Sequence, residues 1–567
     1  MTVINPIRRE LLKNALVTIA DNALVMVIRT ARTANVKNSM DFSSAICNAA
    51  GVLAAQGMAV PVHLGVVMPA LKGCMDHFGD DIAEGDVLAS NDPYSGCSHL
   101  NDIFTFKPIY VNGERVAFVS LVLHHTDLGG RVAGGNAADS QEIWEEGLRI
   151  PPVKLRDTGR ENAAIFGIIA SNSRVPDRVI GDLRAQLAAL DEAGREVEAI
   201  AREMGPEAFG AYLADLIRHA EELTRTAISA LPDGSVEFEE WNDDDGVGNG
   251  PIHLHCRLTK RGSEIEVDYS GTQDDTGGAV HCNWEFTVSC TYAALRTVLP
   301  DEVPNNAGLY SPIKVVGRPG SFVSVQYPAA VGSRGQIGFR LRSIVLGALA
   351  KLLPGRMPAC AGGSEFAIVA SGLQPLANGE SRRFLHLEFH NNTGLGGGPD
   401  KDGQDAGPYC IGNLANVPVE LIESENPIRV ESYGFIPDSG GDGEFRGALG
   451  LQRAYRFLTD NVRVQVRSDR YTSKPWGIFG GGPGAGGRIV ANAGTAKEQA
   501  LPSKFIRTFG AGDVLSVAMA AAGGYGPVEK RDGAAIEKDI HQGKMTSAHA
   551  ARVYGYRADA ADPSEAA

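Results

Sequence analysis

Apolar residues near the start of the chain recur every three or four positions, which places them on one face of an α-helix. Pro6 suits the first turn of such a helix, so we expect a helix over residues 6–35. Long helices are also expected over residues 177–204 and 207–231, and a further helix over residues 284–299. The apolar positions of the first helix are Leu11, Leu12, Ala15, Leu16, Ile19, Ala23 and Val27.

Paired apolar runs predict β-hairpins. In residues 103–124 the two runs flank Asn112-Gly113, the dipeptide of a tight type I′ turn. The second run ends in His124 and His125. Because side chains alternate across a strand, only one of these histidines faces a given side of the sheet. Further strands are expected at residues 253–257, 264–269 and 462–466.

Composition narrows the class of protein. A chain of 567 residues allows several domains with buried cores, and its formal net charge of -15 argues against nucleic-acid phosphates or anionic lipid as partners. The eight cysteines include no C-x-x-C pair, which disfavours a thiolate zinc site. No signal segment and no run of about 20 apolar residues is recognised. We therefore expect a cytoplasmic protein with reduced thiols that binds neither nucleic acid nor membrane.

Histidine and aspartate side chains are concentrated between Asp41 and Asp127. Imidazole and carboxylate groups at this density suit a divalent cation that activates water or polarises a carbonyl group. The H-x-x-D spacing of His99 and Asp102 is also common where histidines only form hydrogen bonds to carboxylates, so both interpretations stand. The candidate residues are Asp41, His63, Asp92, His99, Asp102, His124, His125 and Asp127.

The sequence pattern changes from long helices to short strands at Pro232-Asp233-Gly234, a predicted turn. Short β-like runs and glycine clusters dominate beyond it. We expect a multi-domain α+β protein, with an N-terminal mixed α/β domain that contains the candidate metal site and with β-rich, glycine-rich domains after it. The expected divisions are residues 1–232, 233–420 and 421–557, followed by a disordered tail at residues 558–567.

A series of motifs runs along nearly the whole chain in one order. They lie at residues 39–46, 61–65, 91–102, 124–130, 145–155, 172–186, 438–450, 475–484 and 522–527. Together they resemble the hydantoinase B family, the B-type subunits of ATP-dependent enzymes that open amide rings, to which acetone and acetophenone carboxylase subunits are related. Two positions depart from the family pattern: Gly96-Cys97-Ser98 replaces two glycines and a threonine, and Pro527 follows Gly526 directly.

The resemblance implies a metal site built from Asp41, His99, Asp102 and His124. This nitrogen and oxygen ligand set fits Zn²⁺, Mn²⁺ or Fe²⁺ better than Ca²⁺, and its two carboxylates allow a second ion. His125 and Asp127 are then expected to orient the ligands or to carry a proton as catalytic groups.

The resemblance also implies an ATP-binding partner, the hydantoinase A-type subunit, which holds ATP and Mg²⁺ in an α2β2 or larger assembly. The hypothesis is that the partner phosphorylates a cyclic amide (a hydantoin, 5-oxoproline or a lactam) and that water activated by the metal of this chain opens the ring. The alternative within the family is a subunit of an ATP-dependent ketone carboxylase. A non-catalytic scaffold and a stand-alone metallohydrolase are the further alternatives.

Several other features allow a purely structural interpretation as well as a functional one. His63 is either a group that contacts substrate or ligands, or a satisfied buried histidine. The glycine-rich run at residues 479–487 lacks the lysine of a phosphate-binding loop and is interpreted as a structural turn. His386, Glu388 and His390 alternate on one strand face, either as a second ligand set or as a solvated face or hydrogen-bonded strand end. Cys97 is expected to be a small buried side chain, and Arg446 either contacts the partner subunit or substrate or lies in a structural loop.

Overall fold

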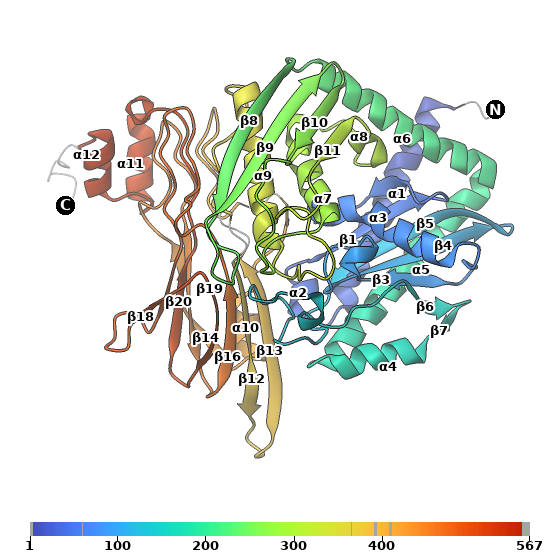
Figure 1. Ribbon diagram of the computed structural model, residues 1–567, viewed down its shortest axis with the longest axis horizontal. Coiled ribbons are helices and arrows are strands. Elements are labelled where there is room, and N and C mark those ends of the chain that lie inside the picture. Colours follow the sequence, from blue (N-terminus) through green and yellow to red (C-terminus); the bar gives the residue numbers. More distant parts are fainter. Residues whose placement is uncertain (1–3, 59, 364–365, 391–393, 408–410, 558–567) are drawn as a thin grey trace, which may run out of the picture.

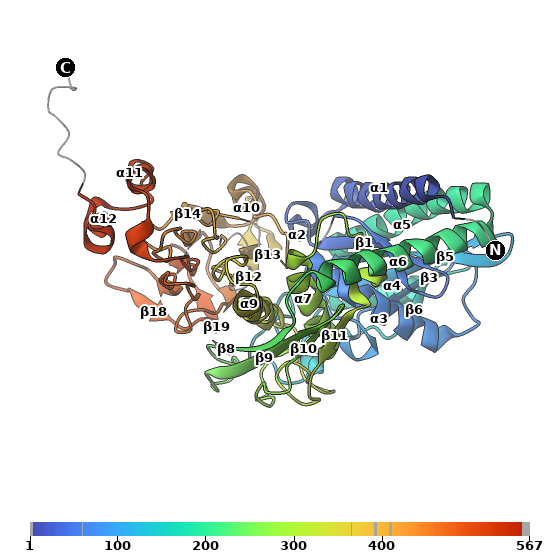
Figure 2. The same ribbon diagram turned by 90° about the horizontal axis from the view of Figure 1, so that it is seen from above.

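The computed structural model describes residues 4–557, except residues 59, 364–365, 391–393 and 408–410, so the expected tail at 558–567 lies outside the described residues. Helices are mixed with strands that form four sheets, which confirms the expected α+β class. The molecule is elongated, with the N-terminal part at one end and the C-terminal strands and helices at the other (Figures 1 and 2).

The N-terminal part is a seven-stranded antiparallel sheet with helices on both faces, in the strand order β2-β1-β5-β4-β3-β6-β7. One face packs against α1, α5 and α6 through one apolar core, and the other packs against α3 through a second. The helices are α1 (Pro6–Thr30), α2 (Ala34–Lys37), α3 (Pro61–Phe78), α4 (Ala163–Asn172), α5 (Pro176–Met204) and α6 (Pro206–Ser229). The strands are β1 (Phe42–Asn48), β2 (Leu53–Gln56), β3 (Val87–Ser90), β4 (Asp102–Val111), β5 (Glu114–His124), β6 (Val153–Asp157) and β7 (Arg160–Glu161).

The long helices agree with the expectation except at the end of α1. The chain leaves the helix after Thr30 because the backbone N–H groups of Arg32 and Thr33 donate to Asp182 on α5 instead of to a helical carbonyl. Of the helices that the structure describes, α1 alone is long and apolar enough to cross a membrane by length and composition. In this fold one side of α1 is buried, largely against α5.

The expected hairpin at residues 103–124 is β4-β5. Asn112 and Gly113 at its turn have φ angles of 55° and 81°, the left-handed values that a type I′ turn requires. The long helices end at Ser229 and β8 starts at Gly234, so the change of pattern at Pro232 coincides with the start of a new sheet.

The central part is a four-stranded sheet, β11-β10-β9-β8, against which α7 and α9 pack. The strands expected at residues 253–257 and 264–269 are β9 and β10, which pair as a hairpin. The helix expected from residue 284 is α7, which ends earlier in a 3₁₀ turn. The elements are β8 (Gly234–Asn242), β9 (Ile252–Arg261), β10 (Glu264–Asp268), α7 (Trp284–Leu295), α8 (Ala307–Tyr310), β11 (Ile313–Val316) and α9 (Gly335–Leu352).

Two further sheets, β13-β12-β16-β19 and β14-β15-β20-β17-β18, share one apolar core. Strands from before residue 420 pair with strands from after it, so the sheets do not divide at the boundary expected there. The elements are β12 (Phe366–Pro375), β13 (Ser381–His390), α10 (Val419–Glu425), β14 (Ile428–Phe435), β15 (Leu451–Phe457), β16 (Val462–Arg467), β17 (Arg488–Ala491), β18 (Gln499–Leu501), β19 (Lys504–Phe509) and β20 (Val514–Ala518).

The glycine clusters come together beside α11 (Gly533–His541) and α12 (Ser547–Tyr554) (Figure 1). We call this region the glycine-rich layer; it comprises residues 394–398, 438–450, 475–487 and 520–527. Its segments bond backbone to backbone: Gly397 N–H donates to the Gly523 carbonyl (2.9 Å), and Gly524 N–H donates to that of Gly482 (2.9 Å). These backbone contacts favour the structural interpretation of the run at residues 479–487.

Candidate metal centre

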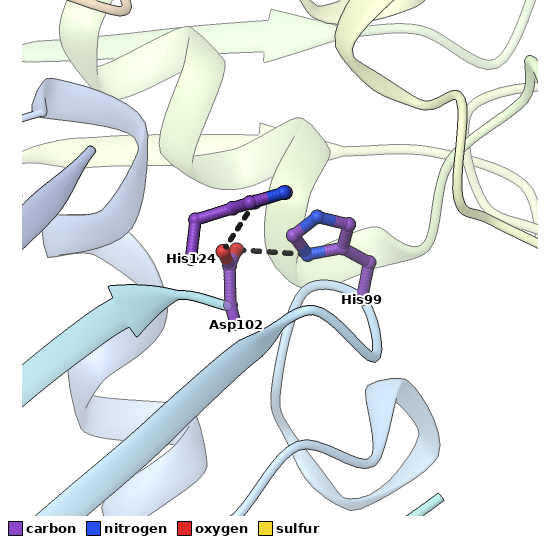
Figure 3. Close-up of side chains that lie close together, drawn as sticks. All are labelled: His99, Asp102 and His124. Carbon is purple, nitrogen blue, oxygen red and sulfur yellow. Dashed lines mark hydrogen bonds and ion pairs between the residues drawn. The ribbon is translucent and has the colours of Figure 1, made fainter. Parts of the chain in front are cut away.

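The β4-β5 hairpin itself brings a carboxylate beside an imidazole. Asp102 lies directly opposite His124 in the antiparallel register, and directly opposite residues point to the same face. The Asp102 Oδ1 and His124 Nδ1 atoms are 3.2 Å apart. His99 lies in the turn that leads into β4, with its Nδ1 atom 2.9 Å from Asp102 Oδ2 (Figure 3).

Two neighbouring elements add Asp41 and His63. Asp41 immediately precedes β1, the strand beside β5, and its carboxylate lies 3.8 Å from His124 Nδ1. His63 is in the first turn of α3, with its Nε2 atom 3.6 Å from Asp102 Oδ2 and 3.8 Å from Asp41 Oδ1. The Ser43 hydroxyl lies 3.1 Å from the other ring nitrogen of His63. The structure therefore places all four expected ligands and His63 in one cluster.

Arg334 is a member of the site that sequence reasoning missed. Its guanidinium donates to Asp102 Oδ2 (2.9 Å) and to the Ser98 hydroxyl (3.1 Å), and Ser98 in turn donates to Asp102 Oδ2 (2.7 Å). Arg334 directly precedes α9, so it reaches the cluster from the central part of the chain. An arginine is not a metal ligand, and no local pattern reveals a contact across 232 positions.

The cluster lines a small cavity of about 60 Å³ where the three parts of the chain meet. Phe389 comes from β13, Phe286 from α7 and Phe339 from α9. Apolar walls around buried charges lower the local dielectric and strengthen their interactions. The apolar lining residues are Val60, Val62, Phe286, Phe339, Phe389, Ile411 and Leu414.

Burial and charge set the protonation states. Burial lowers the pKa of His63, and burial followed by the Arg334 guanidinium lowers the pKa of His99 well below its ordinary value. Burial alone would raise the pKa of Asp102, but its interactions with the histidines, His99 first, hold that pKa well below its usual range. Burial raises the pKa of Asp41. Neutral imidazoles beside an ionised carboxylate are the protonation states that cation binding requires.

The residues fit a divalent cation. Ligand atoms of His99, Asp102 and His124 all lie within 4.8 Å of one another, and all three residues are buried. His124 Nε2 is buried and has no hydrogen-bond partner among the described residues, which is costly for a ring nitrogen unless a ligand occupies it. A set of imidazole nitrogens and carboxylate oxygens is one that first-row transition ions accept.

His125 and Asp127 lie outside the cavity lining. Since His124 faces the cluster, His125 faces the opposite side of the sheet, where its Nε2 atom lies 3.4 Å from Gln186 Oε1 on α5. Asp127 accepts from the Gly134 N–H (2.9 Å) and from the Arg174 guanidinium (2.9 Å). The structure thus separates these two expected catalytic residues from the expected ligands.

The remaining candidates have partners within the fold. Glu388 accepts from the Tyr455 hydroxyl (2.9 Å) and pairs with Arg453, and His386 Nε2 lies 3.2 Å from Glu388 Oε2. Both side chains are buried, so this face is not solvated, and their contacts favour the hydrogen-bonded strand over a second ligand set. The His390 side chain lies outside the described residues. Cys97 is fully buried, and burial raises the pKa of its thiol well above the ordinary value. Arg446 pairs with Asp405 and Asp539, which favours the structural loop.

Comparison with known proteins shows the family to which the chain belongs. A family model described as hydantoinase B/oxoprolinase matches residues 5–528, so the chain belongs to that family. The B-type subunit of a putative D-/L-hydantoinase from Pseudomonas sp. (strain NS671) is 28% identical over 97% of this chain and 95% of that protein.

Solved structures share the whole architecture. The ATP-dependent caprolactamase from Pseudomonas jessenii matches with a TM-score of 0.91 and 26% identity, over 100% of this chain and 99% of that chain. A nucleotide-free acetone carboxylase matches with a TM-score of 0.89 over 97% of this chain and 79% of that chain. At 18% identity, the second likeness shows a common fold alone.

Proposed function

We propose that this chain is the metal-holding subunit of an ATP-dependent enzyme that opens the ring of a small cyclic amide. The observation that carries this proposal is the buried cluster of His99, Asp102 and His124 beside an apolar-walled cavity. The family and the likeness to an ATP-dependent caprolactamase support the choice of a cyclic amide.

Asp41, His99, Asp102 and His124 would hold the cation, with His63 beside them. When bound, a divalent cation supplies Lewis-acid chemistry, because it lowers the pKa of water and polarises a carbonyl oxygen. Ser98 and Arg334 hold the Asp102 carboxylate in one orientation, as outer partners of metal ligands do. The aromatic walls from α7, α9 and β13 exclude bulk water from the reacting group.

Amide resonance makes the carbonyl carbon a poor electrophile, so ATP would be used to activate it before the ring opens. The hydantoinase relative is named as one of the subunits of an assembly, and we therefore assign that step to an A-type partner. An assembly with two copies of each chain is the expected stoichiometry, and the mass of the purified complex tests it.

The direct test is to purify the chain with its ATP-binding partner, identify the bound metal, and screen hydantoin, 5-oxoproline and caprolactam for ring opening coupled to ADP release. The expected result is metal-dependent turnover of one cyclic amide. Equal turnover by a fully demetallated complex would contradict the proposal. Turnover of acetone that requires bicarbonate, with no turnover of amides, would identify a carboxylase instead.

A further inference from the structure

Two large aromatic side chains, Trp144 and Tyr327, are exposed on the surface and contact each other. Trp144 is 57% exposed and Tyr327 is 51% exposed. Their rings contact edge to face with centroids 5.8 Å apart, and Tyr94 contacts Tyr327 in the same way at 5.3 Å. The Arg149 guanidinium lies 5.2 Å from the Tyr327 ring centroid. We call Tyr94, Trp144, Arg149 and Tyr327 the aromatic patch.

The patch is held in place by backbone and core contacts across two parts of the chain. The Ile143 N–H donates to the Pro328 carbonyl (2.9 Å), and the Tyr94 hydroxyl donates to the Ala329 carbonyl. Leu100, Ile143, Val325 and Val331 form a separate apolar cluster against which Tyr94 packs. Exposed rings fixed in this way lose little conformational freedom when another protein covers them.

Two of the three segments that carry the patch, those of Tyr94 and Tyr327, continue directly into the metal centre. The segment from Tyr94 reaches His99 and Asp102, and Leu100 between them belongs to the cluster beneath the patch. The segment from Tyr327 reaches Arg334, whose guanidinium bonds Asp102. A protein bound on the patch therefore contacts the two loops that position the candidate ligands.

We propose that the aromatic patch is the docking surface for the ATP-binding partner, an inference that rests on the proposed function. Tryptophan, tyrosine and arginine are the residue types that dominate binding energy at protein interfaces. A cyclic amide that is activated on the partner has to reach the cavity of this chain. Docking of the partner over the loops that carry the candidate ligands brings the partner's ATP site close to that cavity. The complementary surface on the partner is an apolar pocket that accepts the Trp144 indole.

The test measures the affinity of the full-length chain for the purified partner. Trp144→Ala is expected to weaken binding by at least about tenfold, and Trp144→Ala with Tyr327→Ala further, because central aromatic residues cost most when truncated. Trp241→Ala is the matched control: this tryptophan on β8 is 43% exposed, and its loss should change the affinity by less than about twofold. Metal content and the unfolding midpoint of each free variant show that the site and fold survive.

Unchanged affinity of the double variant would overturn the docking surface while leaving the proposed function intact. Self-association of the wild-type chain that is lost in Trp144→Ala would also overturn it, since a second copy would then cover the patch. Failure of the wild-type chain to bind any ATP-binding partner would instead contradict the proposed function itself.

Discussion

The candidate metal centre and the glycine-rich layer bring distant segments together by different means. At the metal centre, side chains of Asp41, His63, His99, Asp102 and His124 converge from a sheet, a helix and a loop. In the glycine-rich layer the backbones themselves touch, and Gly397, Gly482, Gly523 and Gly524 bond one another through peptide groups. The first arrangement depends on which side chains are present and the second on their absence, so substitutions should act on binding in one region and on folding in the other.

The largest loss of folding stability is expected from alanine substitutions in the glycine-rich layer. A Cβ atom at Gly523 would lie 2.0 Å from the Trp476 carbonyl oxygen, and one at Gly481 would lie 2.2 Å from the Gly524 oxygen. Backbone cannot yield as a side chain does, so Gly523→Ala should destabilise the fold by about 3 kcal/mol or more. Denaturant unfolding or the yield of soluble folded protein measures this loss.

Gly167→Ala is the control for that experiment, because a Cβ at Gly167 on α4 meets nothing within 4 Å. Gly523→Ala with wild-type stability would show that the layer adjusts without cost and would remove the contrast between the two regions.

At the metal centre, His99→Ala should abolish metal binding while the fold persists. Loss of an outer partner of a ligand costs about 10- to 100-fold in metal affinity or activity, so loss of a ligand should exceed about 100-fold. Metal analysis and an unfolding curve of the same sample separate the two effects. His125→Ala is the matched histidine variant, and it should retain metal because His125 faces α5. Full metal content in His99→Ala would remove His99 from the ligand set.

The sequence alone predicts the elements that form by local rules. The Asn112-Gly113 turn predicts the β4-β5 hairpin, but the register that starts at this turn would pair Asp102 with Leu123. An irregularity between Ile109 and Tyr110 shifts the register by one residue and so places Asp102 opposite His124. The alternation of strand side chains correctly separates His124 from His125. The sequence does not predict that Arg334 belongs to the site, because its contact with Asp102 depends on how α9 packs against the N-terminal part. No local sequence pattern predicts that β12 pairs with β16 across residue 420 either.

The region around the candidate metal centre should also give the fold a pH-dependent stability. Glu146 accepts from the Gly332 N–H (2.5 Å) two residues before Arg334, and burial raises its pKa from 4.5 to about 8. Between these values the folded chain holds a proton that the unfolded chain has released. Stability from this group is therefore present below pH 4.5 and declines as pH rises through about 8, by up to about 1.4 kcal/mol per pH unit.

Urea unfolding at pH 5 and pH 8 measures this decline. Glu146→Gln keeps the shape and an acceptor for Gly332 but cannot ionise, so the difference in unfolding free energy between the two pH values should shrink in the variant. The same difference in the variant and the wild type would assign the pH dependence to other groups.

The smallest effect tests whether the glycine-rich layer is special or whether any glycine in this chain resists replacement. Gly210 is an exposed position within α6, and a Cβ there meets nothing within 4 Å. Glycine in a helix interior is less favourable than alanine by about 0.8–1 kcal/mol, because glycine has more freedom to lose on folding. Gly210→Ala should therefore raise the unfolding free energy by about that amount, opposite in sign to Gly523→Ala. A loss of stability in Gly210→Ala, measured by the same denaturant curves, would mean that close backbone contact is not what distinguishes the glycines of the layer.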